Sequence, residues 1–270
     1  MRILRRRRFA VLLLAAGALA PATYPALAQT PPRQETSMPS DIDPQSGFRL
    51  PLPKREELDE TARQTFDEAS KPGANIAGLQ GPAGVQLYSP KTTRHLRALN
   101  RYLRFEAGIS PHIREIAILI TAREMDSQFE WVAHEPEALK EGVPQDVIDV
   151  IKHRKSTAGL DPTDALVIEL GRQLWRDHKV STETFAKLKQ TFGPNKLVDL
   201  VLLMGNYAGT AAMLTAVDMQ LHKGKQPLLP IPCLSLGADE KLVGRHRLLA
   251  QRRHGRRKLR PGDACTRQQE

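Results

Sequence analysis

Cysteine is almost absent from this chain of 270 residues, which has only two, Cys233 and Cys265. Both lie near the end of the sequence, so the segment 29–232, which carries every strong periodic pattern, contains no thiol. Reduction of a peroxide by a protein thiol needs a thiolate nucleophile and a second thiol that resolves the sulfenic acid. The lack of cysteine therefore argues against thiol chemistry in this segment. Export would allow the two cysteines to pair, although nothing in their spacing requires it.

Long apolar runs are also lacking. The run Ala10–Ala20 has eleven residues, whereas a helix that spans a bilayer needs about twenty. It is flanked by the arginines Arg5–Arg8 and by Ala26-Leu27-Ala28, the small-x-small pattern that signal peptidase accepts. We therefore predict a secretory signal over residues 1–28, cleaved after Ala28, and a periplasmic or secreted protein with no stable membrane span. The arginines fit both the general secretory and the twin-arginine routes, and a retained N-terminal anchor is the alternative.

Excess charge is missing from the middle of the chain, although the whole sequence has a formal net charge of +10. Residues 1–28 contribute +5 and residues 233–270 contribute +6, which leaves −1 for residues 29–232. A nearly neutral domain has no basic face that would attract phosphates, so we expect no nucleic-acid partner for it. We predict that the arginine-rich tail 233–270 is disordered. Two interpretations of the tail stay open: it binds anionic lipid or nucleic acid, or it has no role.

Strand-like alternation and internal repeats are absent as well, and every strong periodic segment is helical. Residues 29–48 are rich in Pro, Ser, Asp and Gln and are interpreted as a linker. Residues 49–232 are long enough for one domain with a hydrophobic core. The predicted helices are 55–70, 90–106, 111–125, 127–140, 145–154, 162–178, 182–192 and 195–222. The expected fold is all-α, a compact helical bundle.

Several helix boundaries carry the punctuation that helices need. Ser89, Ser110 and Asp161 each place a capping side chain before a proline in the first turn. Gly142 and Gly193 are each followed shortly by a proline and fit helix stops.

Two of the predicted helices have distinctive surfaces. In 111–125, isoleucines and a leucine form nearly one stripe, which predicts one buried face. In 195–222, small residues recur at three- and four-residue spacing, which lets another helix approach closely, either within a subunit or between subunits. Asp199 and Asn206 argue against a membrane span there.

One stretch has the residue types for acid–base chemistry, the sequence AREMDSQFEWVAHEPEAL at residues 122–139. Glu130 and His134 are four residues apart, so they share one face of a helix. A pair of this kind on a helix surface is commonly a weak structural contact worth roughly 0.2–0.5 kcal/mol. The alternative is that the glutamate orients the imidazole, which then donates or accepts a proton.

Three segments of the chain carry a family resemblance: GPAGVQLYSP, LNRYLRFEAGISPHIREIAILITARE and SQFEWVAHEPEALKEGVPQDVI. They resemble the carboxymuconolactone decarboxylase family, which includes the AhpD-like alkylhydroperoxidases. The resemblance covers about residues 49–226. The AhpD-like branch has a Glu, eleven residues, Cys-x-x-Cys, three residues and a His. Glu115, Ser127, Glu130 and His134 fall on that spacing, so the Glu and His are kept and both thiols are replaced. A thiol peroxidase is therefore the least favoured member of the family.

The resemblance implies a cofactor-free decarboxylase of a small carboxylated lactone or a related acid. Such a reaction needs an electron sink and an acid that returns a proton to carbon, and neither requires a metal. We expect His134 to act as acid or base, Glu130 to orient it and Glu115 to carry a second proton. An ion pair with a neighbouring arginine is the structural alternative for Glu115.

Three further residues are candidates for substrate binding. Arg123 can pair with a substrate carboxylate bidentately or with a structural partner. Trp131 can wall the pocket or belong to the core, and Ser127 is also expected to cap the helix that begins beside it. The resemblance further implies a homo-oligomer, trimeric or hexameric.

Metal and phosphate sites are not predicted. Di-iron helical bundles use two Glu-x-x-His motifs, whereas here the gap is one residue longer and no second copy occurs. HEPEA at 134–138 is not the zincin motif, because its fifth residue is Ala138. GLQGPAG at 78–84 lacks the Lys-Ser/Thr of a phosphate loop, so it is interpreted as a loop over the pocket mouth or a plain connection.

The predicted export is at odds with a decarboxylase of aromatic-acid catabolism, which the family resemblance places in the cytoplasm. The alternative function is a non-enzymatic, oligomeric protein of the same fold that binds a small molecule.

Overall fold

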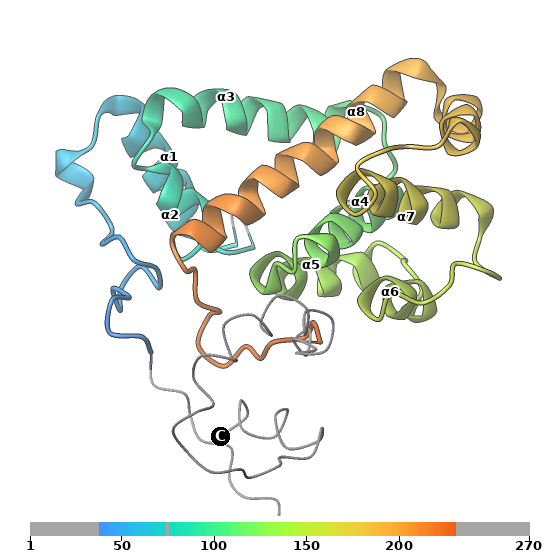
Figure 1. The fold of residues 1–270 in the computed structure, drawn as a ribbon. Coiled ribbons are helices and arrows are strands. Elements are labelled where there is room, and N and C mark those ends of the chain that lie inside the picture. Colours follow the sequence, from blue (N-terminus) through green and yellow to red (C-terminus); the bar gives the residue numbers. More distant parts are fainter. Residues whose placement is uncertain (1–37, 74–75, 231–270) are drawn as a thin grey trace, which may run out of the picture. The chain divides into compact units, whose positions relative to one another are not determined.

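The computed structural model describes residues 38–73 and 76–230, and these are helical (Figure 1). The predicted signal 1–28 and the basic tail with Cys233 and Cys265 lie outside the described residues. Within the described ranges the nearest approach to a sheet is one isolated bridge between Asp43 and Phe48. The all-α prediction is confirmed. The elements are a 3-10 helix η1 (Arg55–Glu57), α1 (Glu60–Ser70), α2 (Pro82–Gln86), α3 (Pro90–Arg101), a π-helical turn η2 (Tyr102–Glu106), α4 (Pro111–Glu124), α5 (Gln128–Lys140), α6 (Gln145–Lys152), α7 (Pro162–Trp175) and α8 (Thr182–Ala216).

Local sequence signals account for many of the helix boundaries. The Ser110 hydroxyl accepts a hydrogen bond from the Ile113 N–H at the start of α4, and Asp161 caps α7 in the same way. Gly193 has a φ of 73°, which breaks α8 at the predicted stop and separates its two halves. The second half ends at Ala216, so the prediction of helix up to residue 222 is wrong.

Helix α4 is the centre of the domain. It packs against α5, α6, α7 and α8, and every residue from Ile113 to Arg123 is buried. The predicted single buried face is therefore wrong, because neighbouring helices surround α4 on all sides. The approach of α7 is close enough to need a glycine, since a Cβ at Gly171 would lie 2.6 Å from the Ile120 side chain.

The second half of α8 divides the domain. Helices α1, α2 and α3 lie on one side of it, and α4 to α7 lie on the other (Figure 1). Among the described helices, α8 is the one long and apolar enough to cross a membrane by length and composition. Leu200, Leu203 and Met204 are buried in the domain, and the kink at Gly193 interrupts the helix, so α8 serves as a core helix here.

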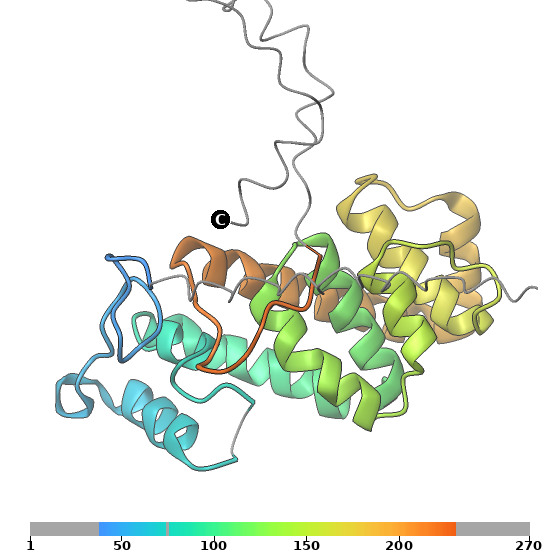
Figure 2. The same ribbon diagram turned by 90° about the horizontal axis from the view of Figure 1, so that it is seen from below.

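Both ends of the described chain pack onto these helices. Phe48 is fully buried, and the Arg49 N–H donates to the Val217 carbonyl at 2.9 Å. The last residues of the predicted linker 29–48 therefore belong to the domain, because an aromatic residue anchors them. After α8 the chain runs back to the start of α5, where the Gln128 side chain bonds the backbone of Leu229 (Figure 2).

Candidate active site

A cleft of about 1760 Å³ lies between the α1–α3 layer and the helices α5 and α8. Its walls come from α3 and η2 on one side and from α5 and the second half of α8 on the other. The polar and aromatic side chains that line it include Arg104, Glu130, His134 and Tyr207.

A short, buried polar contact beside this cleft joins α4 to α5. The Nδ1 atom of His134 lies 2.8 Å from Oε2 of Glu115, and both side chains are buried. A carboxylate only accepts hydrogen bonds, so we assign the proton to Nδ1 and leave Nε2 as the basic nitrogen. Burial alone would raise the pKa of Glu115. Hydrogen bonds and charge from His134 and Arg114 outweigh it and lower that pKa.

Glu130 faces the other nitrogen of the same imidazole. Its Oε2 atom lies 3.6 Å from Nε2 of His134, which is an ion-pair distance but too long for a hydrogen bond. Burial raises the pKa of the Glu130 carboxyl, partly offset by the charges of His134 and Arg104. Of the two carboxyl groups beside His134, that of Glu130 is therefore the one that favours its protonated form.

The structure brings the three predicted catalytic residues together, but the roles of Glu115 and Glu130 toward His134 are exchanged relative to the prediction. The sequence predicted Glu130 as the orienter of His134 and Glu115 as a second proton carrier. Instead, Glu115 accepts the short bond from Nδ1, because the packing of α5 across α4 places His134 directly against it. Glu130 is left facing Nε2 at the cleft wall.

Two arginines surround Glu115. Arg114 donates from Nε to Oε1 of Glu115 at 3.0 Å and from Nη1 to the carbonyl of Arg104 at 3.1 Å. Arg104 is more weakly held, since its Nη2 atom lies 4.0 Å from Oε1 of Glu115. The buried Nε of Arg104 has no hydrogen-bond partner within the described residues.

Sequence reasoning missed Arg104 and Tyr207. Arg104 lies in the π-helical turn η2, and a π-turn inside a predicted α-helix has no sequence signature that we used. The Tyr207 ring meets the His134 ring edge to face, with centroids 5.2 Å apart. Burial raises the pKa of the Tyr207 hydroxyl, so it stays neutral. Its place beside Gly205 and Gly209 on α8 was the signal available.

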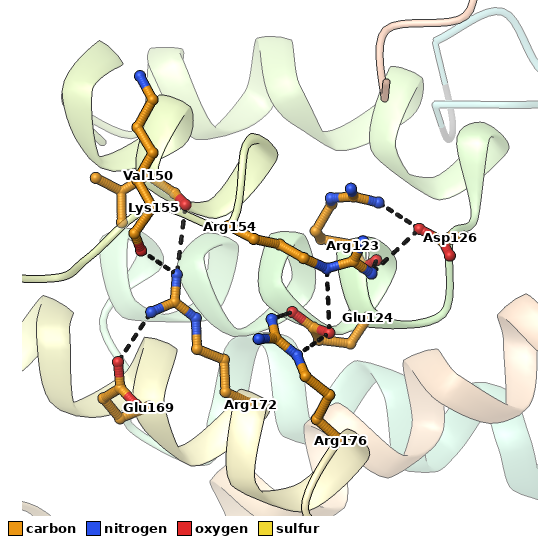
Figure 3. Close-up of polar contacts among 9 residues, drawn as sticks. All are labelled: Arg123, Glu124, Asp126, Val150, Arg154, Lys155, Glu169, Arg172 and Arg176. Atoms are coloured by element: carbon orange, nitrogen blue, oxygen red, sulfur yellow. Dashed lines mark hydrogen bonds and ion pairs between the residues drawn. The ribbon is translucent and has the colours of Figure 1, made fainter. Parts of the chain in front are cut away.

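The structure does not bring the three predicted substrate-binding residues to the cleft. Trp131 is fully buried, and its indole N–H donates to Glu135 at 2.5 Å. Ser127 stands at the N-cap position of α5, but its hydroxyl makes no capping bond. Arg123 pairs with Asp126, which follows α4, and its carbonyl accepts a bond from Arg154 (Figure 3).

The position of Arg123 has a structural explanation. At the end of α4, Glu124 pairs with Arg154 beyond α6 and with Arg176 at the end of α7 (Figure 3). Arg123 belongs to this network of guanidinium and carboxylate groups, which ties three helices together. The prediction that it clamps a substrate at the site of His134 is wrong, because it does not border the cleft.

Among the described residues, no group of three or more His, Cys, Asp or Glu side chains is arranged to hold a metal ion. The side chains that line the cleft, which include Arg104, Glu130 and His134, offer acid–base and electrostatic chemistry.

Comparison with known proteins gives an informative likeness among solved structures. No family model matches the chain, and no curated protein matches it. Among solved structures it is similar to an AhpD core protein from Ralstonia eutropha JMP134, described as an uncharacterized peroxidase-related alkylhydroperoxidase. The TM-score is 0.55 and the identity is 16%, over 66% of this chain and 93% of that chain. The chain therefore has the AhpD-like fold.

Proposed function

We propose that the cleft decarboxylates a small carboxylated lactone or a related acid without a cofactor, with Glu130 and His134 as the proton-transferring groups. The observation that carries the proposal is the buried row Glu115–His134–Glu130, in which one imidazole stands between two carboxyl groups of opposite pKa shift. Two interacting carboxyl groups whose surroundings move their pKa values apart are a common basis for separate acid and base roles.

The proposed reaction starts with cleavage of the bond between the substrate carbon and its carboxylate. The electron pair of that bond stays on the carbon and spreads into the lactone carbonyl, while carbon dioxide leaves. Protonated Glu130 then gives its proton to the carbon, and it regains one from solvent through Nε2 of His134. The net change is loss of carbon dioxide and gain of one solvent proton by the product.

Glu115 acts in this scheme through His134. Its carboxylate holds the Nδ1 proton in place, so Nε2 stays available for proton exchange with Glu130. Arg104 also borders the cleft, and its positive charge favours the binding of an anionic substrate there.

Reduction of peroxides is less well supported. The spacing that carries two thiols in the AhpD-like branch holds Ser127 and Glu130 here, and the described residues include no cysteine. A serine hydroxyl and a carboxyl cannot pass through a sulfenic acid.

The test is a panel of carboxylated lactones and hydroxy acids, followed by release of carbon dioxide from wild type and from His134→Ala, Glu130→Gln and Glu115→Gln. We expect Glu130→Gln and His134→Ala to lower kcat at least about 100-fold. Equal rates for wild type and His134→Ala would remove the imidazole from the mechanism. Tight binding of a lactone with no turnover by wild type would assign the chain to the second candidate class, a small-molecule-binding protein.

A further inference from the structure

We propose that the cleft is built for an organic acid with an extended apolar body. In this proposal Arg104 pairs with the carboxylate, and the apolar body lies along α8 beside Gly205 and Gly209. The inference rests on the proposed function only in using the same cleft, and it adds the substrate class.

The first support is the pairing state of the arginines that border the cleft. Arg97, Arg101 and Arg114 each have a glutamate partner at 3.4 Å or less. Arg104 lies over the Phe105 ring at 5.1 Å and has its nearest carboxylate, Glu115, only at 4.0 Å, and its buried Nε donates no hydrogen bond to another described residue. Its side chain is 19% exposed and borders the cleft. A guanidinium in this state pairs well with an incoming carboxylate.

The second support is the apolar strip that α8 presents to the cleft. The residues that line it from this helix include Val201, Leu202, Gly205, Gly209 and Met213. A rise of 1.5 Å per residue makes the strip from Val201 to Met213 about 18 Å long. At Gly205 and Gly209 an added Cβ would meet nothing within 4 Å, so the backbone there borders open space.

The strip extends beyond the reacting groups. His134 contacts Tyr207 near the middle of the strip, and Met213 lies six residues, or about 9 Å, further along α8. Phe129 of α5 packs with Met213 in one hydrophobic cluster at that end, and both side chains border the cleft. A five-membered lactone alone leaves this apolar end unfilled.

The carboxylate at Arg104 is one that the substrate keeps. A guanidinium bound to a departing carboxylate would stabilise the ground state more than the transition state, because the charge moves away as carbon dioxide forms. Arg104 therefore selects and positions an anionic substrate, and the scissile carboxylate lies toward Glu130.

Straight-chain acids that cannot react test the substrate class without turnover. We would titrate the full chain with butanoate, hexanoate and octanoate, and with their primary amides, by isothermal calorimetry. Each added methylene should tighten Kd by up to about fourfold if the apolar strip takes the chain. The amides should bind at least about tenfold more weakly than the acids, because the charge-assisted bond to Arg104 is lost.

Two matched pairs of variants locate the contacts. Arg104→Gln should abolish the preference for acid over amide. Arg101→Gln, which removes an exposed charge from α3, should keep that preference. Gly209→Leu should weaken octanoate at least about tenfold and leave butanoate unchanged. Ala212→Leu, at an exposed position of the same helix that does not border the cleft, should leave both unchanged.

Three results would overturn the proposal. The first is a Kd that does not depend on chain length, and the second is an equal loss of acid preference in Arg101→Gln and Arg104→Gln. The third is failure of every acid to bind, as would follow if a second copy of the chain fills the cleft. The titration is independent of catalysis. Binding through Arg104 that depends on chain length, without lactone turnover, would contradict only the proposed reaction. Lactone turnover without such binding would contradict only the proposed substrate class.

Discussion

Replacing Glu115 by glutamine tests the electrostatic core of the site. The substitution keeps the size of the side chain but removes the charge that accepts bonds from His134 Nδ1 at 2.8 Å and Arg114 Nε at 3.0 Å. A hydrogen bond to a charged group contributes about 1.5–3 kcal/mol, and breaking a buried ion pair costs about 3–5 kcal/mol. Because the amide oxygen can still accept one bond, we expect a loss of about 2–4 kcal/mol in the free energy of unfolding. For a domain of this size that lowers Tm by roughly 4–16 °C.

The pH dependence of this difference has a defined sign. The pKa of Glu115 is lowered in the folded state, so its carboxylate stabilises the fold above the unfolded pKa of about 4.3. That stabilisation disappears as the pH falls through the folded pKa, because a protonated glutamate resembles glutamine. The wild-type advantage should therefore be complete at neutral pH and shrink in acid.

Thermal unfolding followed by circular dichroism between acid and neutral pH measures the effect. Glu106→Gln is the matched control, since Glu106 pairs with Arg101 at 3.0 Å but is 51% exposed. Its Tm should stay close to that of wild type at every pH. A Glu115→Gln protein as stable as wild type at neutral pH would refute the assignment of a charged, partnered carboxylate at this position.

Three more predictions concern other features of the same domain. Under the proposed function, turnover should fall as the pH rises through the raised pKa of Glu130, which a pH-rate profile would check. Above that pKa the ionised carboxylate is buried at a cost in stability, so Glu130→Gln should have a higher Tm than wild type there. Thermal melts of the two proteins at matched pH would check this. Gly171→Ala should lower the free energy of unfolding by about 1–3 kcal/mol in chemical denaturation, since the added Cβ would lie 2.6 Å from the Ile120 side chain. Gly209→Ala is the control, because its Cβ would meet nothing within 4 Å, and its stability should be unchanged or higher. Equal losses of stability in the two variants would contradict the close packing of α4 and α7. The family resemblance implies a trimer or hexamer, so light scattering on a sizing column should show one, and a monomer would refute it; Val198 and Phe185, 57% and 52% exposed on α8, are apolar side chains available to such a contact.

Local sequence signals predicted where the helices begin and end better than they predicted what packs around each helix. Side-chain caps at Ser110 and Asp161 and the stop at Gly193 depend on the backbone nearby, so they can be read from the sequence. Burial of α4 on every side depends on which helices pack around it. The apolar stripe in residues 111–125 did not indicate that neighbouring helices also cover the other faces of α4.

The candidate site was predictable in its members but not in its geometry. Helical spacing places Glu130 and His134 on one face, and the family resemblance adds Glu115. Which carboxyl binds which imidazole nitrogen depends on how α5 crosses α4, and no spacing within one helix determines that. Arg123 and Trp131 were wrong as pocket residues for a local reason, because each binds a partner three or four residues along the chain, Asp126 or Glu135, and neither borders the cleft.

Position 130 shows how one environment supports different chemistry with a different side chain. The family pattern that the chain resembles has a thiol at this spacing, whereas this chain has a carboxyl. Burial disfavours the charged form of either group. A buried carboxyl therefore holds its proton to a higher pH, where it can still donate it. Under the proposed function, the Glu115–His134 pair exchanges protons with the Glu130 carboxyl, a group that has no thiol redox chemistry.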